Sequence, residues 1–169
     1  MRKVLDPIER VSEVVFGVLM AMTFIGALNV ATAGEQEVRT VLKAALGCNI
    51  AWGLTDGIMY LVAMLTERSR ARMLGEAPQD APRLHADDWL GALHVLVLVT
   101  LSTFPLVVPF LIFDRLGAAL LGSRLVAVVT LFVAGWMLAA YSGGNRWRAG
   151  IGMAAVGALL VGALMALGG

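Results

Sequence analysis

The chain has 169 residues, of which 59% are hydrophobic and 15% are charged, and its mean hydropathy is +0.83. Water-soluble domains are about 45–50% apolar and about 25% charged, so a soluble fold of this length could not bury so much apolar surface. The formal net charge of +1 argues against a nucleic-acid partner, which binds a strongly basic face. The composition predicts an integral membrane protein that is embedded in a lipid bilayer.

Five apolar stretches follow one another, and each is about as long as the ~20 residues that a helix needs to cross the hydrocarbon core. A backbone in lipid must satisfy its own hydrogen bonds, which favours helices over isolated strands. We therefore expect an all-α fold, a polytopic membrane protein formed by one transmembrane domain. The predicted helices cover residues 14–33, 40–65, 89–113, 117–141 and 149–168, and residues 66–88 form a polar loop.

The basic residues indicate the orientation, because cytoplasmic loops are enriched in lysine and arginine. Nine of them fall on the side that carries the N-terminus and the 66–88 loop, and four fall on the other side. We expect the N-terminus inside and the C-terminus outside. The first 13 residues are too charged for a cleavable signal peptide, which suits the inner membrane of a bacterium.

One polar pair stands out within the second predicted span. Asp56 lies deep in the span, Asn49 lies two helical turns before it on the same face, and Met59 lies beyond. A polar residue at mid-membrane is costly and indicates a functional site, so this pair predicts a site that binds a cation or carries a proton. The alternative is a carboxylate that is hydrogen-bonded to a neighbouring helix or hydrated near the inner interface.

The first predicted span offers further ligands. Glu13 and Met20 are seven residues apart, and Met22 is close by. Carboxylates suit harder metal ions and thioethers suit softer ones, so we count all three as candidate metal ligands. The alternative is that the methionines only fill space between helices and that Glu13 is hydrated at the lipid headgroups.

Prolines and small residues predict how the helices pack. Pro105 and Pro109 interrupt the third span, since each lacks a backbone N–H. The carbonyl groups that lose their hydrogen bonds could face a cavity or a cation. The alternative is a kink that only shapes the helix bundle. In the last span, small residues recur every four positions from Gly150 to Gly162. Such a face predicts a homodimer or an intramolecular seam.

The sequence contains none of the motifs that would indicate an enzyme. The sequence lacks a His/Glu pair with metalloprotease spacing and a Gly-x-Ser-x-Gly elbow. It also lacks a phosphate-binding loop and a dinucleotide fingerprint. We expect no catalytic residues and no permanently bound cofactor.

Several segments resemble the vacuolar iron transporter family. Val15-Phe16-Gly17 resembles the opening of that family's first helix. Asn49-Ile50-Ala51 and Thr55-Asp56-Gly57-Ile58-Met59 resemble the Ala-Asn and Ala-Asp-Gly-Ile-Ser-Met elements of its second helix. The best match is Phe104-Pro105-Leu106-Val107-Val108-Pro109-Phe110, which is similar to an Ile-Pro-Leu-Leu-Pro-Tyr type segment of its third helix.

The resemblance implies five transmembrane helices, a cytoplasmic N-terminus and a homodimer that exports Fe²⁺ or Mn²⁺, coupled to protons. The chain departs from the family where Met20-Ala21 replaces an Asp-Gly, and the 66–88 loop is not a glutamate-rich metal-binding domain. Glu13 or Asp56 would then substitute for the missing aspartate. The alternatives are a non-transporting scaffold or partner-binding subunit with the same fold, or a carrier of another small solute.

Overall fold

The protein is all-helical, as the sequence predicts. The computed structural model describes residues 5–26, 34–75 and 83–166, and within these residues it contains α-helices and no strand. The described helices are α1 (Pro7–Gly26), α2 (Glu35–Met73), α3 (Ala86–Leu101), α4 (Phe104–Ile112), α5 (Leu116–Ser142) and α6 (Arg146–Ala166).

Three segments of the described chain are long and apolar enough to cross a membrane: Val38–Met73, Ala86–Ile112 and Leu116–Ser142. They coincide with the second, third and fourth predicted spans, which supports the prediction of a membrane protein. The second of them consists of α3 and α4 together. Residues 27–33 and 167–168, at the ends of the first and last predicted spans, lie outside the described residues.

The helix α2 continues beyond the predicted end of its span at residue 65 and reaches Met73. The additional turns contain good helix formers, and Arg70 and Arg72 in the last turn interact favourably with the negative end of the helix dipole. The first part of the predicted polar loop is therefore helical, while residues 76–82 lie outside the described part of the chain.

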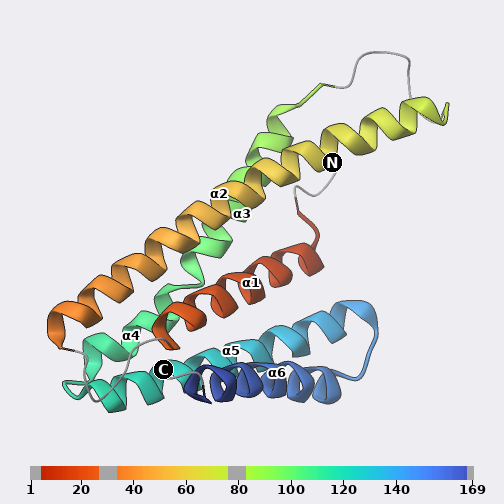
Figure 1. Ribbon diagram of the computed structural model, residues 1–169. Coiled ribbons are helices and arrows are strands. Elements are labelled where there is room, and N and C mark those ends of the chain that lie inside the picture. Colours follow the sequence, from red (N-terminus) through yellow and green to blue (C-terminus); the bar gives the residue numbers. More distant parts are fainter. Residues whose placement is uncertain (1–4, 27–33, 76–82, 167–169) are drawn as a thin grey trace.

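The helix α1 occupies the centre of the arrangement. It lies between the α2–α3 pair and the α5–α6 pair (Figure 1), and it contacts α2, α3, α5 and α6. The far ends of α2 and α3 extend together beyond the other helices (Figure 1). Any group on the inward faces of α1 and α2 is therefore enclosed by several helices.

A tight turn joins α5 to α6. Gly143 follows α5 with φ of 74°, a left-handed conformation that glycine adopts at little cost. The next amide, Gly144 N–H, donates to Ala139 O at 3.0 Å, and Asn145 Oδ1 accepts from Arg148 N–H at 3.0 Å, as in an N-cap. The turn falls where the sequence predicts the end of the fourth span.

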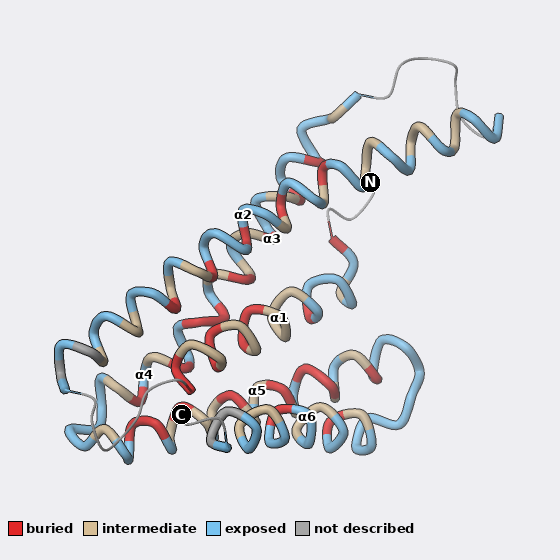
Figure 2. The backbone as a smooth tube through the Cα atoms, in the orientation of Figure 1, coloured by how far each residue is buried: buried red, intermediate tan, exposed pale blue. Residues whose placement is uncertain are grey.

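The main apolar core surrounds α1. Val18, Met22 and Ile25 of α1 pack with Leu106 of α4 and Leu131 of α5, and all five are buried. Large apolar side chains also cover the outer faces of the helices, where Figure 2 shows mostly exposed residues. Soluble monomers rarely expose apolar patches of this extent, so these faces fit a bilayer.

Glycines allow close approach of neighbouring helices. A Cβ added at Gly57 of α2 would lie 3.0 Å from Ala92 O of α3, and one at Gly135 of α5 would lie 2.6 Å from Ala149 O of α6. The predicted small-residue face of the last span is only partly used: Gly150 packs against Phe132 of α5, whereas Gly162 has no described atom within 4 Å of an added Cβ. The first part of this face is an intramolecular seam.

Candidate functional site

The third span is broken at Ser102 and Thr103, between α3 and α4. Pro105 has no N–H to donate, and the hydrogen bonds around it shorten to a three-residue spacing: Thr103 N–H donates to Thr100 O at 3.2 Å and Leu106 N–H to Thr103 O at 3.1 Å. As a result, Val99 O loses its usual backbone partner, Thr103 N–H. The predicted interruption is present, and Pro109 lies within α4 without a second break.

Asn49 of α2 fills this break. Its side chain is completely buried, and its Nδ2 donates to Thr103 Oγ1 at 2.6 Å and to Gly17 O of α1 at 2.9 Å. A longer contact of 3.4 Å reaches Val99 O, which also accepts from Ser102 Oγ at 2.6 Å. The amide therefore ties three helices together, while its Oδ1 is buried without a hydrogen-bond partner among the described residues.

Gly17 makes this contact between the helices possible. A Cβ at this position would overlap Ser102 Oγ and would lie 2.6 Å from Val99 O. Only a residue without a side chain allows α1 to approach the break in the third span so closely.

Glu13 of α1 and Asp56 of α2 form a pair of carboxyl groups. Both side chains are half-buried. The hydrogen bond from Asn49 to Gly17 O and the contact between the rings of Phe16 and Trp52 place α1 beside α2, and Glu13 and Asp56 each follow about one turn further along these helices. Within the described residues, no hydrogen bond or ion pair reaches either carboxyl group. The structure thus brings together two of the predicted ligands, and it leaves Asn49 two turns away from them along α2.

Two of the three candidate methionines lie away from these carboxyl groups. Met22 is buried beside Val18 and Ile25 in the apolar core, on the face of α1 opposite Glu13, because nine residues correspond to half a rotation beyond two full turns. Met59 is 57% exposed on the outer surface of α2. Met20 is half-buried. The described residues contain no group of three or more His, Cys, Asp or Glu side chains that could hold a metal ion.

An ion pair that the sequence did not reveal joins the last turns of α2 to the first turn of α3. Arg68 donates to both oxygens of Asp88, at 2.7 and 2.8 Å, and Asp88 also accepts from His85 N–H at 2.7 Å. The spacing of His85 and Asp88 was a possible signal for a helix N-terminus, but nothing in the sequence identified Arg68 as the partner.

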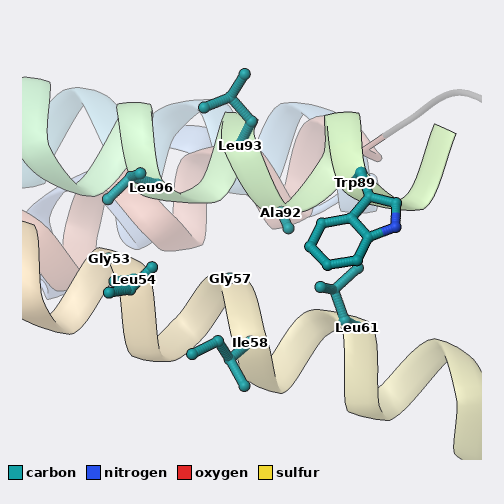
Figure 3. Close-up of a pocket in the computed structure, with 9 residues that line it drawn as sticks. All are labelled: Gly53, Leu54, Gly57, Ile58, Leu61, Trp89, Ala92, Leu93 and Leu96. Atoms are coloured by element: carbon teal, nitrogen blue, oxygen red, sulfur yellow. The ribbon is translucent and has the colours of Figure 1, made fainter. Parts of the chain in front are cut away.

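A shallow groove of about 200 Å³ lies between α2 and α3 (Figure 3). Gly57 and Ala92 face each other across it, and Trp89 lies over Leu61 at one end (Figure 3). Its lining is made of apolar side chains and glycines, so the groove offers no ligand to a cation.

The comparisons with known proteins leave the site to be interpreted from its geometry. No family model matches the chain, and no curated protein sequence is significantly similar to it.

Proposed function

We propose that the chain crosses the membrane five times, with its N-terminus in the cytoplasm of a bacterium. The 20 residues of α1 and the 21 of α6 supply the two spans beyond the three segments described above. The position of α1 between helices of the three apolar segments supports this. A helix that is packed between spanning helices lies at the same depth in the membrane as they do.

Cysteine labelling tests this topology. The chain has one cysteine, so a Cys48→Ser background can receive single cysteines at exposed positions on either side, Arg70→Cys and Asp114→Cys. A membrane-impermeant maleimide added to intact cells should label the cysteine at 114 and reach the one at 70 only after lysis. Labelling of both in intact cells would contradict the orientation.

We propose that the protein transports a divalent cation out of the cytoplasm. The observation that carries this proposal is the pairing of Glu13 with Asp56 on neighbouring helices. Two carboxyl groups without a basic partner are costly in apolar surroundings, and like charges at close range disfavour their joint ionisation. A cation bound between them, or a proton shared by them, removes both costs.

The chemistry of this pair favours Mn²⁺ or Fe²⁺ bound by oxygen. Carboxylate oxygens suit the harder divalent ions, and Met22 and Met59, which would favour softer ions, lie elsewhere in the structure. Because the same carboxyl groups bind protons when the cation leaves, the pair also supports exchange against protons. The resemblance to the vacuolar iron transporter family agrees with this choice.

Flux into proteoliposomes tests the proposal. Mn²⁺, Fe²⁺, Co²⁺ and Zn²⁺ would be compared with a fluorescent metal indicator, and a second dye would follow the internal pH. We expect uptake of Mn²⁺ or Fe²⁺ accompanied by proton movement in the opposite direction. Folded protein that passes none of the four ions would refute a role in divalent metal transport.

A second candidate function is a non-transporting scaffold or partner-binding subunit. The hydrogen bonds of Asn49 to Gly17 O and Thr103 Oγ1 favour it, because they give one predicted ligand a packing role. Thermal unfolding in detergent distinguishes the two functions, since a ligand that binds only the folded state raises its stability. A scaffold should show no shift with Mn²⁺ or Fe²⁺.

We also propose a homodimer that forms through α6. Gly162 and its neighbour Ala158 lie on the exposed side of that helix, and small residues allow close helix contact in lipid. Replacement of Gly162 by Leu should shift the protein toward monomer when its mass is measured in detergent. An unchanged mass would exclude this face.

A further inference from the structure

The proposed transport function makes no use of the groove of about 200 Å³ between α2 and α3 (Figure 3). Its floor is shallow because glycines bring the two helices together: a Cβ added at Gly57 would lie 3.0 Å from Ala92 O. Along α2 the lining extends from Gly53 to Leu61, which is about 12 Å at 1.5 Å per residue. The groove is therefore narrow, elongated and apolar.

Large apolar side chains form the rim of the groove. Leu54 and Ile58 of α2 are 55% and 53% exposed, and Leu93 of α3 is 53% exposed. A neighbouring helix is about 10–12 Å wide, so it would rest on these side chains and leave the floor at Gly57 without contacts. A single acyl chain is narrow enough to reach the floor, and it restores the dispersion contacts that an empty groove would lose.

Arginines lie beyond the end of the groove that Leu61 and Trp89 form. Arg68 follows Leu61 by seven residues, or about 10 Å along α2, and Arg72 lies one turn further. Arg72 is eighteen residues from Leu54, which is five full turns, so both lie on the same face of α2. Because helical side chains lean toward the N-terminus of their helix, Arg72 leans back toward the groove.

The charge of Arg68 is already compensated, whereas two other arginines at this end are available to a ligand. Arg68 pairs with Asp88, and it also donates to Arg83 O at 2.6 Å, which holds the backbone of Arg83 beside it. In the part of the chain that the structure describes, the side chains of Arg72 and Arg83 have no hydrogen-bond or ion-pair partner. Their positive charges therefore remain at the end of the groove.

The exposed acidic residues nearby lie on other faces of the two helices. Glu67 precedes Arg72 by five residues, about 140° around α2, and Asp87 precedes Trp89 by two residues, about 200° around α3. The apolar groove thus ends in positive charge, which is complementary to a ligand with an apolar chain and an anionic headgroup.

We propose that the groove binds an anionic phospholipid, with one acyl chain against Gly57 and the phosphate at Arg72 and Arg83. Arginine donates two parallel hydrogen bonds to a phosphate group. Trp89, which is 59% exposed, lies between the chain and the phosphate, and tryptophan favours this level of the bilayer. The proposed topology places this end of the groove at the cytoplasmic leaflet, where arginine clusters attract anionic lipids. Lipid binding does not depend on ion transport.

A photoreactive side chain in the groove identifies what occupies it. Benzoylphenylalanine would replace Ile58, the protein would be irradiated in native membranes, and the product would be weighed by mass spectrometry. We expect a product with the mass of one chain and one phospholipid. A product with the mass of two chains, or of one chain and a different protein, would overturn the proposal.

Lipid titrations test the role of the charge. Phosphatidylglycerol and phosphatidylcholine with identical acyl chains would be added to protein in detergent, and binding would be followed by native mass spectrometry. We expect phosphatidylglycerol to bind more tightly. Arg72→Gln should weaken its binding by roughly fivefold, the contribution of one arginine near an anionic surface, and leave phosphatidylcholine binding unchanged.

Arg70→Gln is the matched control, because residue 70 precedes Arg72 by two positions and lies about 200° around the same helix. This variant removes the same charge from the opposite face and should bind phosphatidylglycerol as the wild type does. Equal weakening by the two substitutions would indicate attraction to the whole helix end and would overturn the site. Equal affinity of the wild type for the two lipids would overturn it as well.

A pair of tryptophan substitutions tests the place of the acyl chain. Ile58→Trp enlarges the rim over the glycine floor and should weaken the binding of both lipids. Val129→Trp, at a position of α5 that is 60% exposed, should leave both affinities unchanged. Full lipid binding by folded Ile58→Trp would exclude the groove. Mn²⁺ uptake by the wild type bears only on the transport proposal, so either proposal can fail while the other stands.

Discussion

Replacement of Gly17 by Ala tests the close contact between α1 and the broken third span. The new Cβ would lie 2.6 Å from Val99 O and would overlap Ser102 Oγ, so α1 must move away from α3. That movement also draws Gly17 O away from Asn49 Nδ2, now 2.9 Å distant. One added methyl group should therefore disturb both the packing and the buried hydrogen bonds.

The expected cost follows from these two effects. Overpacking a tight core costs about 1–3 kcal/mol, and loss of a buried hydrogen bond adds roughly 1–2 kcal/mol. For a chain of this size each kcal/mol corresponds to about 2–4 °C in Tm, so the apparent Tm in detergent should fall by roughly 5–15 °C. The assay is thermal unfolding followed by intrinsic fluorescence or circular dichroism.

Gly152→Ala in α6 is the matched control, because an added Cβ there meets no described atom within 4 Å. Alanine is a better helix former than glycine by about 1 kcal/mol, so this variant should be unchanged or slightly more stable. Ser102→Ala combined with Gly17→Ala should recover only part of the loss, since the clash with Val99 O remains. If Gly17→Ala unfolds at the same temperature as Gly152→Ala, the close contact is refuted.

Two further variants concern the α2–α3 pair. Asp88→Asn breaks the ion pair with Arg68 and should cost about 1–3 kcal/mol. An unchanged Tm would show that the pair does not stabilise the contact between α2 and α3. Gly57→Val should separate α2 from α3 at Ala92 O and cost about 1–3 kcal/mol, whereas Gly47→Val, with open space around it, should leave Tm within a few degrees.

The helical architecture could be predicted because it depends on local properties. Runs of apolar residues mark the second, third and fourth spans, and Pro105 marks the break in the third, since a missing N–H acts within one turn of its own helix. Asn49 and Asp56 could also be identified from the sequence, because both stand out as polar residues within one apolar stretch. Each of these features can be read from a single segment of sequence.

The roles of individual polar residues could not be predicted, because they depend on which helix faces which. Asn49 and Asp56 share a stretch of α2, but Asn49 meets the break of the third span and Asp56 lies at the level of Glu13 on α1. Met22 is buried in the core, although its place near Glu13 and Met20 in the sequence made it a candidate ligand. Arg68 and Asp88 are twenty residues apart, and their pairing requires the antiparallel contact of α2 with α3.

The initial rate of Mn²⁺ uptake by proteoliposomes that contain Asp56→Asn tests directly whether Asp56 carries transport. The substitution keeps the size of the side chain and removes its charge. Asp87→Asn, an exposed acidic residue outside the predicted spans, is the control. We expect Asp56→Asn to reduce uptake to the level of empty liposomes and Asp87→Asn to retain the wild-type rate. Wild-type uptake by folded Asp56→Asn would refute transport through the Glu13–Asp56 pair.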